Sequence, residues 1–154
     1  FPIRPNDTIR DLHSAANRIF PELVTGVLEQ LASGEVTGHK QDADDVCYWH
    51  QRGERDGEIL WRTFTANDVH NLVRAITHPY PGAYTQLGNS TVRIWSTEVP
   101  KMMIRGTPGR ICVLDSGGPY VICMDTAVRL LDYSIEGTKS TIKNGSTFTQ
   151  KDGV

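Results

Sequence analysis

The sequence predicts an α+β fold: a kinked N-terminal helix and a linker, then a short helix, then a small antiparallel β-barrel. Apolar residues recur at three- and four-residue steps over residues 9–31 and again over 66–77, which is typical of amphipathic helices. From residue 83 the apolar period changes to two, which indicates strands. Five short strands with little to cover them favour a closed or nearly closed barrel, because closure removes exposed sheet edges.

The first predicted helix begins after Pro5, with Asn6 or Asp7 as its N-cap, and ends at Gly34. Pro21 should kink the helix or restart it, since proline suits a first-turn position. The chain offers this helix little to pack on before residue 59, so we expect its partner to lie outside this chain. The apolar stripe consists of Ile9, Leu12, Ala16, Ile19, Leu23, Val27 and Leu31.

Residues 35–58 are polar, which is typical of a linker, and they contain one short extended piece at 46–49. Thr65 and Asp68 then have the spacing of a capping box, which predicts a helix over 66–77. Strands are expected at 83–87 and 91–99, at 110–114 and 120–124, and at 127–133, the first four as two hairpins. The tail from Lys139 is polar, and we expect it to fray.

The short helix runs into a corner with the sequence His-Pro-Tyr-Pro-Gly-Ala at residues 78–83. Pro79 and Pro81 each fix their own φ and push the preceding residue towards an extended backbone. Gly82 permits a bend that other residues resist. The run should form a stiff structural corner that stops the helix and aims the next strand.

Composition excludes several classes of protein. The net charge of −2 argues against a general polyanion binder, and no apolar run is long enough to span a membrane. Three cysteines without a disulfide-like spacing favour a reducing cytoplasm. Cys47 and His50 form one metal-like pair without a second pair, so no metal site is predicted. The chain starts without Met, which we interpret as a fragment or a processed product.

Several runs together resemble the C-terminal domain of the 10-formyltetrahydrofolate-dependent formyltransferases, which include methionyl-tRNA and sugar N-formyltransferases. They are Asp-Gly-Glu-Ile-Leu-Trp at 56–61, Val-His-Asn-Leu-Val-Arg-Ala at 69–75, Pro-Tyr-Pro-Gly-Ala at 79–83, Val-Arg-Ile-Trp-Ser at 92–96, Pro-Gly-Arg at 108–110 and Ala-Val-Arg-Leu-Leu at 127–131. The resemblance covers the chain up to about residue 145. It implies an OB-like barrel over 59–145, a linker at 35–58, a tail at 146–154, and a remnant of the catalytic domain at 1–34.

The resemblance also implies function. The family's catalytic Asn, His and Asp lie in a Rossmann-like domain that this chain mostly lacks, so we expect no catalytic residue here and no activity from this chain alone. The missing domain would bind 10-formyltetrahydrofolate and would be the main partner, and a homodimer is a further expectation. The Pro-Tyr-Pro-Gly-Ala form favours a nucleotide-linked amino sugar as acceptor, whereas nucleic acid is not expected as a partner.

Two alternatives stay open. The first is the tRNA enzyme, whose barrel would help to hold the acceptor arm and would need a basic surface. From residue 81 onward the chain has eight Lys and Arg against six Asp and Glu, and an excess of two is weak support for such a surface. The second alternative is a stand-alone, non-enzymatic binding module, because a barrel of this kind supports many functions.

Three residues of the corner are candidates for a place near the substrate. His78 is the only plausible general base beside a rigid corner, although a histidine at a helix C-terminus also favours the helix dipole. Tyr80 could stack on a base or a sugar, or it could serve packing alone. Gly82 would let the wall bend.

Overall fold

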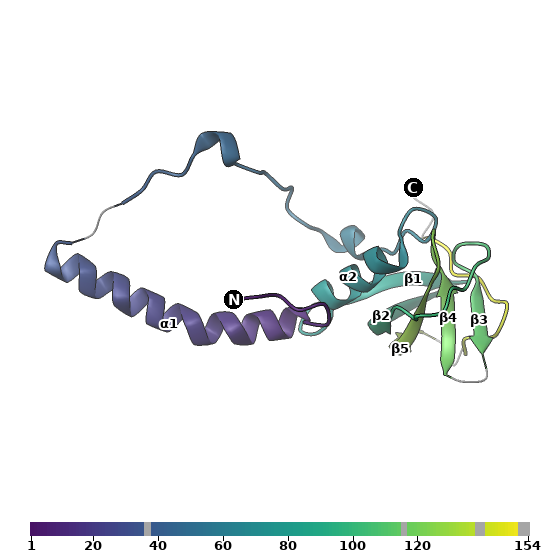
Figure 1. The fold of residues 1–154 in the computed structure, drawn as a ribbon. Helices are drawn as coiled ribbons and strands as arrows, with labels where there is room; N and C mark the ends of the chain where they lie inside the picture. Colours follow the sequence, from purple (N-terminus) through teal and green to yellow (C-terminus); the bar gives the residue numbers. More distant parts are fainter. Residues whose placement is uncertain (36–37, 115–116, 138–140, 151–154) are drawn as a thin grey trace.

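The computed structural model describes residues 1–35, 38–114, 117–137 and 141–150. Figure 1 shows a long helix extending away from a body made of one helix and a sheet, with the linker returning from the far end of the long helix. The elements are α1 (Ile9–Ser33), η1 (Ala43–Asp45), η2 (Glu54–Gly57), α2 (Ala66–Ile76), β1 (Ala83–Leu87), β2 (Ser90–Glu98), β3 (Ile111–Leu114), β4 (Gly118–Ile122) and β5 (Ala127–Ile135). The predicted α+β class is therefore confirmed.

Helix α1 differs from its prediction at its start. The N-cap is Thr8, not Asn6 or Asp7, because the Thr8 N–H and hydroxyl both donate to the Asp11 carboxylate at 2.7 Å. These bonds lower the pKa of Asp11. The helix runs through Pro21 without restarting, and Gly34 ends it with φ +76°, as predicted.

The second half of α1 presents its apolar side chains to solvent. No α1 residue is buried, and each large apolar side chain over residues 20–31 is at least half exposed. The expectation that the partner of this helix lies outside this chain stays a prediction. The exposed side chains are Phe20, Leu23, Val24, Val27, Leu28 and Leu31.

Helix α2 begins at the predicted capping box. The Thr65 hydroxyl and N–H donate to the Asp68 carboxylate, which lowers the pKa of Asp68. The N–H of Ala66 donates to Oδ1 of Asp125, so the turn before β5 also caps this helix. Val69 and Val73 are buried, and they join α2 to the core.

The five strands form one antiparallel sheet in the order β1-β2-β5-β4-β3. Both predicted hairpins and the last strand are confirmed, with β5 two residues longer than expected. The register between β2 and β5 shifts on both sides of Ser96, which is a β-bulge next to Trp95. Bulges of this kind re-aim side chains, and this one lies beside the corner.

The C-terminal residues 145–150, here called the bridging segment, connect the two edge strands of the sheet. Gln86 of β1 exchanges both backbone hydrogen bonds with Thr149, at 3.0 and 2.9 Å. On the other edge the Ile111 N–H donates to the Ser146 carbonyl oxygen at 2.8 Å. The sheet is thus not closed by direct pairing of β1 with β3, and this segment covers both edges instead.

The fraying expected of the tail is wrong for the bridging segment. Its polar side chains do not prevent its backbone from pairing with two open sheet edges. Residues 139–140 and 151–154 of the expected tail lie outside the described residues.

The main core lies between the sheet and α2. It includes Ile59 and Trp61 from the chain before α2, Ile94 from β2 and Phe148 from the bridging segment. Trp61 stacks on Phe148 with 5.7 Å between ring centroids, and its indole N–H donates to the buried Thr85 hydroxyl at 2.9 Å. The bridging segment is thus anchored by a side chain as well as by its backbone.

The described part of the linker, residues 38–58, contains two short 3₁₀ turns and no named strand. The extended piece expected at 46–49 therefore pairs with no strand among the described residues. The three cysteines are all free, and Cys47 is exposed. In the described chain, no helix combines the length and the apolar character needed to cross a bilayer.

Replacing Phe148 by Ala should lower the free energy of unfolding by about 3–5 kcal/mol, because it leaves a cavity against Trp61. The matched control is Phe20→Ala on the exposed side of α1, which should change stability by about 0.5 kcal/mol or less. Urea unfolding followed by tryptophan fluorescence measures both. Equal effects of the two substitutions would contradict the anchoring of the bridging segment by Phe148.

Candidate functional site

The predicted corner is a tight backbone structure between α2 and β1. Gly82 has φ +83°, so the expected bend is present, and its N–H donates to the Ile76 carbonyl oxygen at 2.9 Å. The Tyr80 N–H donates to the Thr77 carbonyl oxygen at 3.0 Å, and the peptide before Pro79 is cis. The corner therefore joins the end of α2 directly to the start of β1.

Trp95 of β2 packs against the corner. Its ring centroid lies 4.1 Å from that of His78 at an interplanar angle of 11°, and a Cβ on Gly82 would be 2.5 Å from its Cζ3. The Thr77 hydroxyl donates to the Trp95 carbonyl oxygen, and the indole N–H donates to the Ser134 hydroxyl. Stacking on Trp95 thus positions His78, and in the described part of the chain no carboxylate hydrogen-bonds to this histidine.

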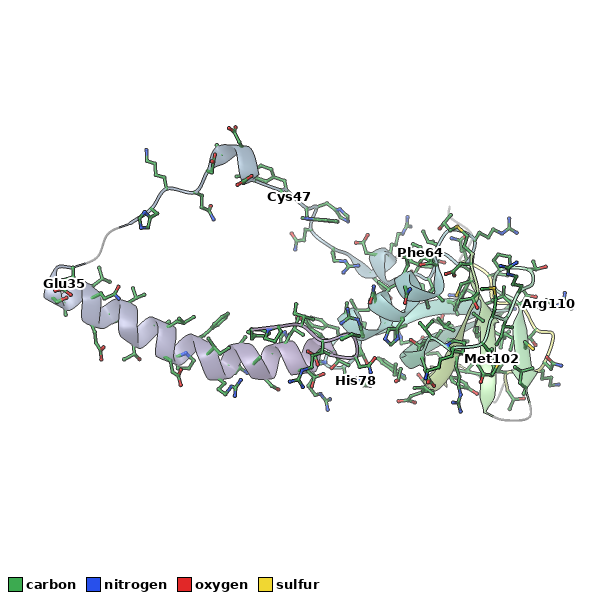
Figure 2. The ribbon with its side chains drawn as sticks, viewed as in Figure 1. Glu35, Cys47, Phe64, His78, Met102 and Arg110 are labelled. Carbon is green, nitrogen blue, oxygen red and sulfur yellow. The ribbon has the colours of Figure 1, made fainter. Side chains whose placement is uncertain are left out.

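The start of α1 is attached to this corner (Figure 2). The Tyr80 hydroxyl lies 3.4 Å from Nε2 of His13, and the two rings meet edge to face at 5.8 Å. Arg74 of α2 donates from Nη1 to the carbonyl oxygen of Asp7 at 2.8 Å. These two links determine where the helix leaves the body.

A hollow of about 820 Å³, here called the corner hollow, is lined by the corner, the start of α1 and η2. Of the predicted site residues, Tyr80, Gly82 and Pro81 line it, whereas His78 and Pro79 do not. Its walls are largely apolar. The other lining residues are Ile9, Arg52, Gly53, Glu54, Asp56, Gly57, Ala75, Ile76, Tyr84 and Arg93.

Arg93 is the charged residue that joins the walls of the corner hollow. Its guanidinium donates to the Pro81 carbonyl oxygen at 2.9 Å and forms ion pairs with Glu136 and, at 3.7 Å, with Glu54. It also lies 5.9 Å from the ring centroid of Tyr84. Because its side chain is about four-fifths buried, it firmly connects the corner, η2 and the end of β5.

Two side chains of the corner hollow have shifted pKa values. Burial raises the pKa of Tyr84, helped by the negative charges of Glu58 and Glu54. The pKa of Asp56 is lowered, first by the hydrogen bond from the Gly53 N–H and then by the hydrogen bond with His50. Asp56 therefore stays ionised, and the Tyr84 hydroxyl stays protonated, near neutral pH.

The side chains of the corner hollow can form a rigid wall beside a substrate, but they offer it few free functional groups. Arg93 and Asp56 are already held by protein partners, and the ring of His78 is stacked on Trp95. Across the described residues, no three side chains of the metal-binding types converge on one point.

Sequence reasoning located the corner but missed Arg93. Its signal was present: Arg93 lies between Val92 and Ile94, both fully buried, so alternation places it on the opposite face of β2. The partners Glu54 and Glu136 lie far away in sequence, and only the fold brings them to this arginine.

Comparison with known proteins gives consistent results. A family model described as "Formyl transferase, C-terminal domain" matches residues 53–150. A methionyl-tRNA formyltransferase from Marinobacter nauticus is 28% identical over 139 residues, which are 90% of this chain and 44% of that protein. A methionyl-tRNA formyltransferase from Geobacter metallireducens is 31% identical over 137 residues, which are 89% of this chain and 43% of that protein. The chain thus spans less than half the length of these relatives.

Solved structures of HypX from Aquifex aeolicus share the fold. One variant aligns with a TM-score of 0.58 and 21% identity over 83% of this chain and 23% of HypX. HypX in complex with tetrahydrofolic acid aligns with a TM-score of 0.58 and 19% identity, over 86% of this chain and 23% of HypX.

Replacing Gly82 by Ala should cost about 1–2 kcal/mol for the left-handed backbone and about 1–3 kcal/mol more for the clash with Trp95. Gly88→Ala is the matched control, because Gly88 also has a positive φ but has open space around it. It should cost only the backbone part. Chemical denaturation measures both, and equal losses would contradict the packing of Trp95 on the corner.

Proposed function

The chain belongs to the formyl transferase C-terminal domain family, and we propose that it is the C-terminal part of an enzyme that formylates the amino group of methionyl-tRNA. The formyl donor in this proposal is 10-formyltetrahydrofolate. The observation that carries the proposal is the match of both methionyl-tRNA formyltransferases across about nine-tenths of this chain.

The acceptor in this proposal differs from the one that the sequence favoured. The Pro-Tyr-Pro-Gly-Ala corner suggested a nucleotide-linked amino sugar, and the relatives reported above give that acceptor no support. A short motif that forms a structural corner is a weak guide to the acceptor, because its side chains build a wall and need not contact the substrate. The methionyl-tRNA alternative fits the relatives better.

We assign the cofactor to the part of the protein outside this chain. The corner hollow does not fit a folate well, because its walls are largely apolar. In addition, all three guanidinium nitrogens of Arg93 and both carboxylate oxygens of Asp56 are engaged by protein groups. The complex of HypX with tetrahydrofolic acid supports a folate cofactor in proteins that share this fold. We therefore assign the corner hollow no part in the proposed reaction.

A group of exposed cations around the bridging segment supports contact with RNA. Arg110 pairs through its backbone with Thr147 of that segment, and its guanidinium would lie 3.9 Å from a Cβ on Gly145. Arg62 and Thr147 line the same small hollow of about 110 Å³. Lys143 accepts a backbone hydrogen bond from Ser146 of that segment, and Arg105 lies in the loop before β3. The basic group consists of these four residues, Arg62, Arg105, Arg110 and Lys143, all exposed and, among the described residues, without an acidic partner.

Several acidic residues are engaged elsewhere. Glu54 and Glu136 pair with Arg93, Asp56 pairs with His50, and Glu98 pairs with Arg129. These acids are paired with other basic groups, so they do not neutralise the basic group, which can meet phosphates although the net charge of the chain is −2. This is why we propose an RNA partner where the net charge alone predicted none.

We propose that the apolar side of α1 packs on the catalytic domain of the same protein. Phe20, Val24 and Leu28 lie on this helix with more than half of each side chain exposed. A large exposed apolar surface normally marks an interaction site. The methionyl-tRNA formyltransferases are more than twice as long as their aligned regions, which gives such a domain a place in the sequence. Self-association of the chain stays a prediction.

The basic group predicts how tRNA binding depends on salt. Four phosphate contacts give a slope of roughly −3 for log affinity against log salt concentration. Replacing Arg62, Arg105, Arg110 and Lys143 together by Gln should bring the slope close to zero. Fluorescence titration with methionyl-tRNA between about 50 mM and 200 mM salt measures it.

The control for this titration is Arg52→Gln with Arg55→Gln, two exposed cations beside the acidic residues of η2. This double variant should keep most of the slope. A slope that is unchanged by the loss of the basic group, or lost in the control, would contradict the assignment of the basic group to RNA.

The chain alone should not transfer a formyl group. Incubation with 10-formyltetrahydrofolate and methionyl-tRNA, or a nucleotide-linked amino sugar, should give no N-formyl product by mass spectrometry. The physical reason is that attack by an amine needs a positioned base and a donor for the oxyanion. In the lining of the corner hollow, Asp56 and Arg93 are already engaged by other protein groups. Measurable turnover would overturn this expectation.

A further inference from the structure

A second hollow of about 650 Å³ lies beside α2. It is here called the α2 hollow. Its lining from α2 comes from residues 67–74, which precede the two α2 residues of the corner hollow, Ala75 and Ile76. Residues near the N-terminus, Pro5, Asn6 and Thr8, form one wall, α2 forms another, and β2 with Leu131 completes it. The α2 hollow has no part in the function proposed above for the basic group or for the apolar side of α1.

Two of its side chains are held in fixed positions by other protein groups. Nδ1 of His70 lies 3.0 Å from the hydroxyl of Thr97, which is 6% exposed. Arg74 donates from Nε to Oδ1 of Asn71 at 2.9 Å and from Nη1 to the Asp7 carbonyl oxygen at 2.8 Å. Side chains that are already fixed lose little entropy when a ligand binds.

The α2 hollow also has hydrogen-bonding capacity to spare. Arg74 uses two of its five N–H donors in these bonds. The side-chain amides of Asn6 and Asn67 form no hydrogen bond within the described residues. Each amide offers a donor and an acceptor side by side.

The charges narrow the ligand class. The residues that line the α2 hollow include one arginine, Arg74, and one carboxylate, Glu98. Glu98 is paired with Arg129 at 3.4 Å, so the positive charge of Arg74 is available to a ligand. A ligand with one negative group and a neutral, hydrogen-bonding ring matches this lining. Asn side chains suit the adenine edge, where they can bond to N6 and N7 together.

We propose that the α2 hollow binds one nucleotide unit, with its phosphate at Arg74 and its base at Asn67. This proposal depends on the function proposed above in one respect: it requires that the formyl acceptor contain a nucleotide. It holds for either acceptor considered above, since a tRNA and a nucleotide-linked sugar both contain one.

The test is isothermal titration of the full chain with adenosine monophosphate. Asn67→Ala should weaken binding about five- to a hundredfold, because it removes both hydrogen bonds to adenine N6 and N7. Asn89→Ala is the matched control, because Asn89 is an exposed asparagine in the turn between β1 and β2. It should leave the affinity unchanged, and circular dichroism checks that both variants fold.

Adenosine and inorganic phosphate serve as the comparison ligands, and each should bind more weakly than adenosine monophosphate. Phosphate binding as tightly as the nucleotide, equal affinities of the Asn67→Ala and Asn89→Ala variants, or no binding at all would overturn the proposal. The salt slope of tRNA binding depends on the basic group instead, so failure of that titration alone would count against the proposed function and not against the α2 hollow.

Discussion

The packing of Trp95 on Gly82 is the contact on which the rest of the structure depends. A Cβ at position 82 would lie 2.5 Å from the indole, so only glycine lets the chain pass so close to the ring. The bulge in β2 lets the Trp95 ring lie against Gly82. The register shift beside Trp95 removes this residue from regular pairing with β5. The same ring positions His78 by stacking.

The corner in turn positions both hollows. Its tight turn follows the end of α2, and Arg74 and Tyr80 near that end hold the start of α1. The corner hollow takes its α2 lining from residues 75–76, and the α2 hollow takes its lining from residues 67–74. One short helix therefore contributes to an apolar wall and to a polar hollow. Its end is held by the hydrogen bond from Gly82 to Ile76, by the hydrogen bond from Thr77 to Trp95 and by the packing of Trp95 on Gly82.

The bridging of the two sheet edges is a separate feature with a different physical basis. The strand order leaves β1 and β3 as the two edge strands. The backbone of the bridging segment hydrogen-bonds to both of them, at Gln86 and at Ile111. Phe148 adds burial to this backbone pairing. Arg62, Arg110 and Lys143 of the basic group lie near the same segment, so the residues that cover the edges also lie beside exposed cations.

The sequence by itself determined the local elements, because their signals are local. The Thr65 and Asp68 capping box, the change of apolar period and the restricted backbone of the prolines each act within a few residues. Only the tertiary structure decided which distant groups meet: the partners of Arg93, the stacking of His78 on Trp95, and the pairing of a polar tail with both sheet edges. The physical reason is that propensity acts between neighbours in sequence, whereas packing and edge pairing act between neighbours in space.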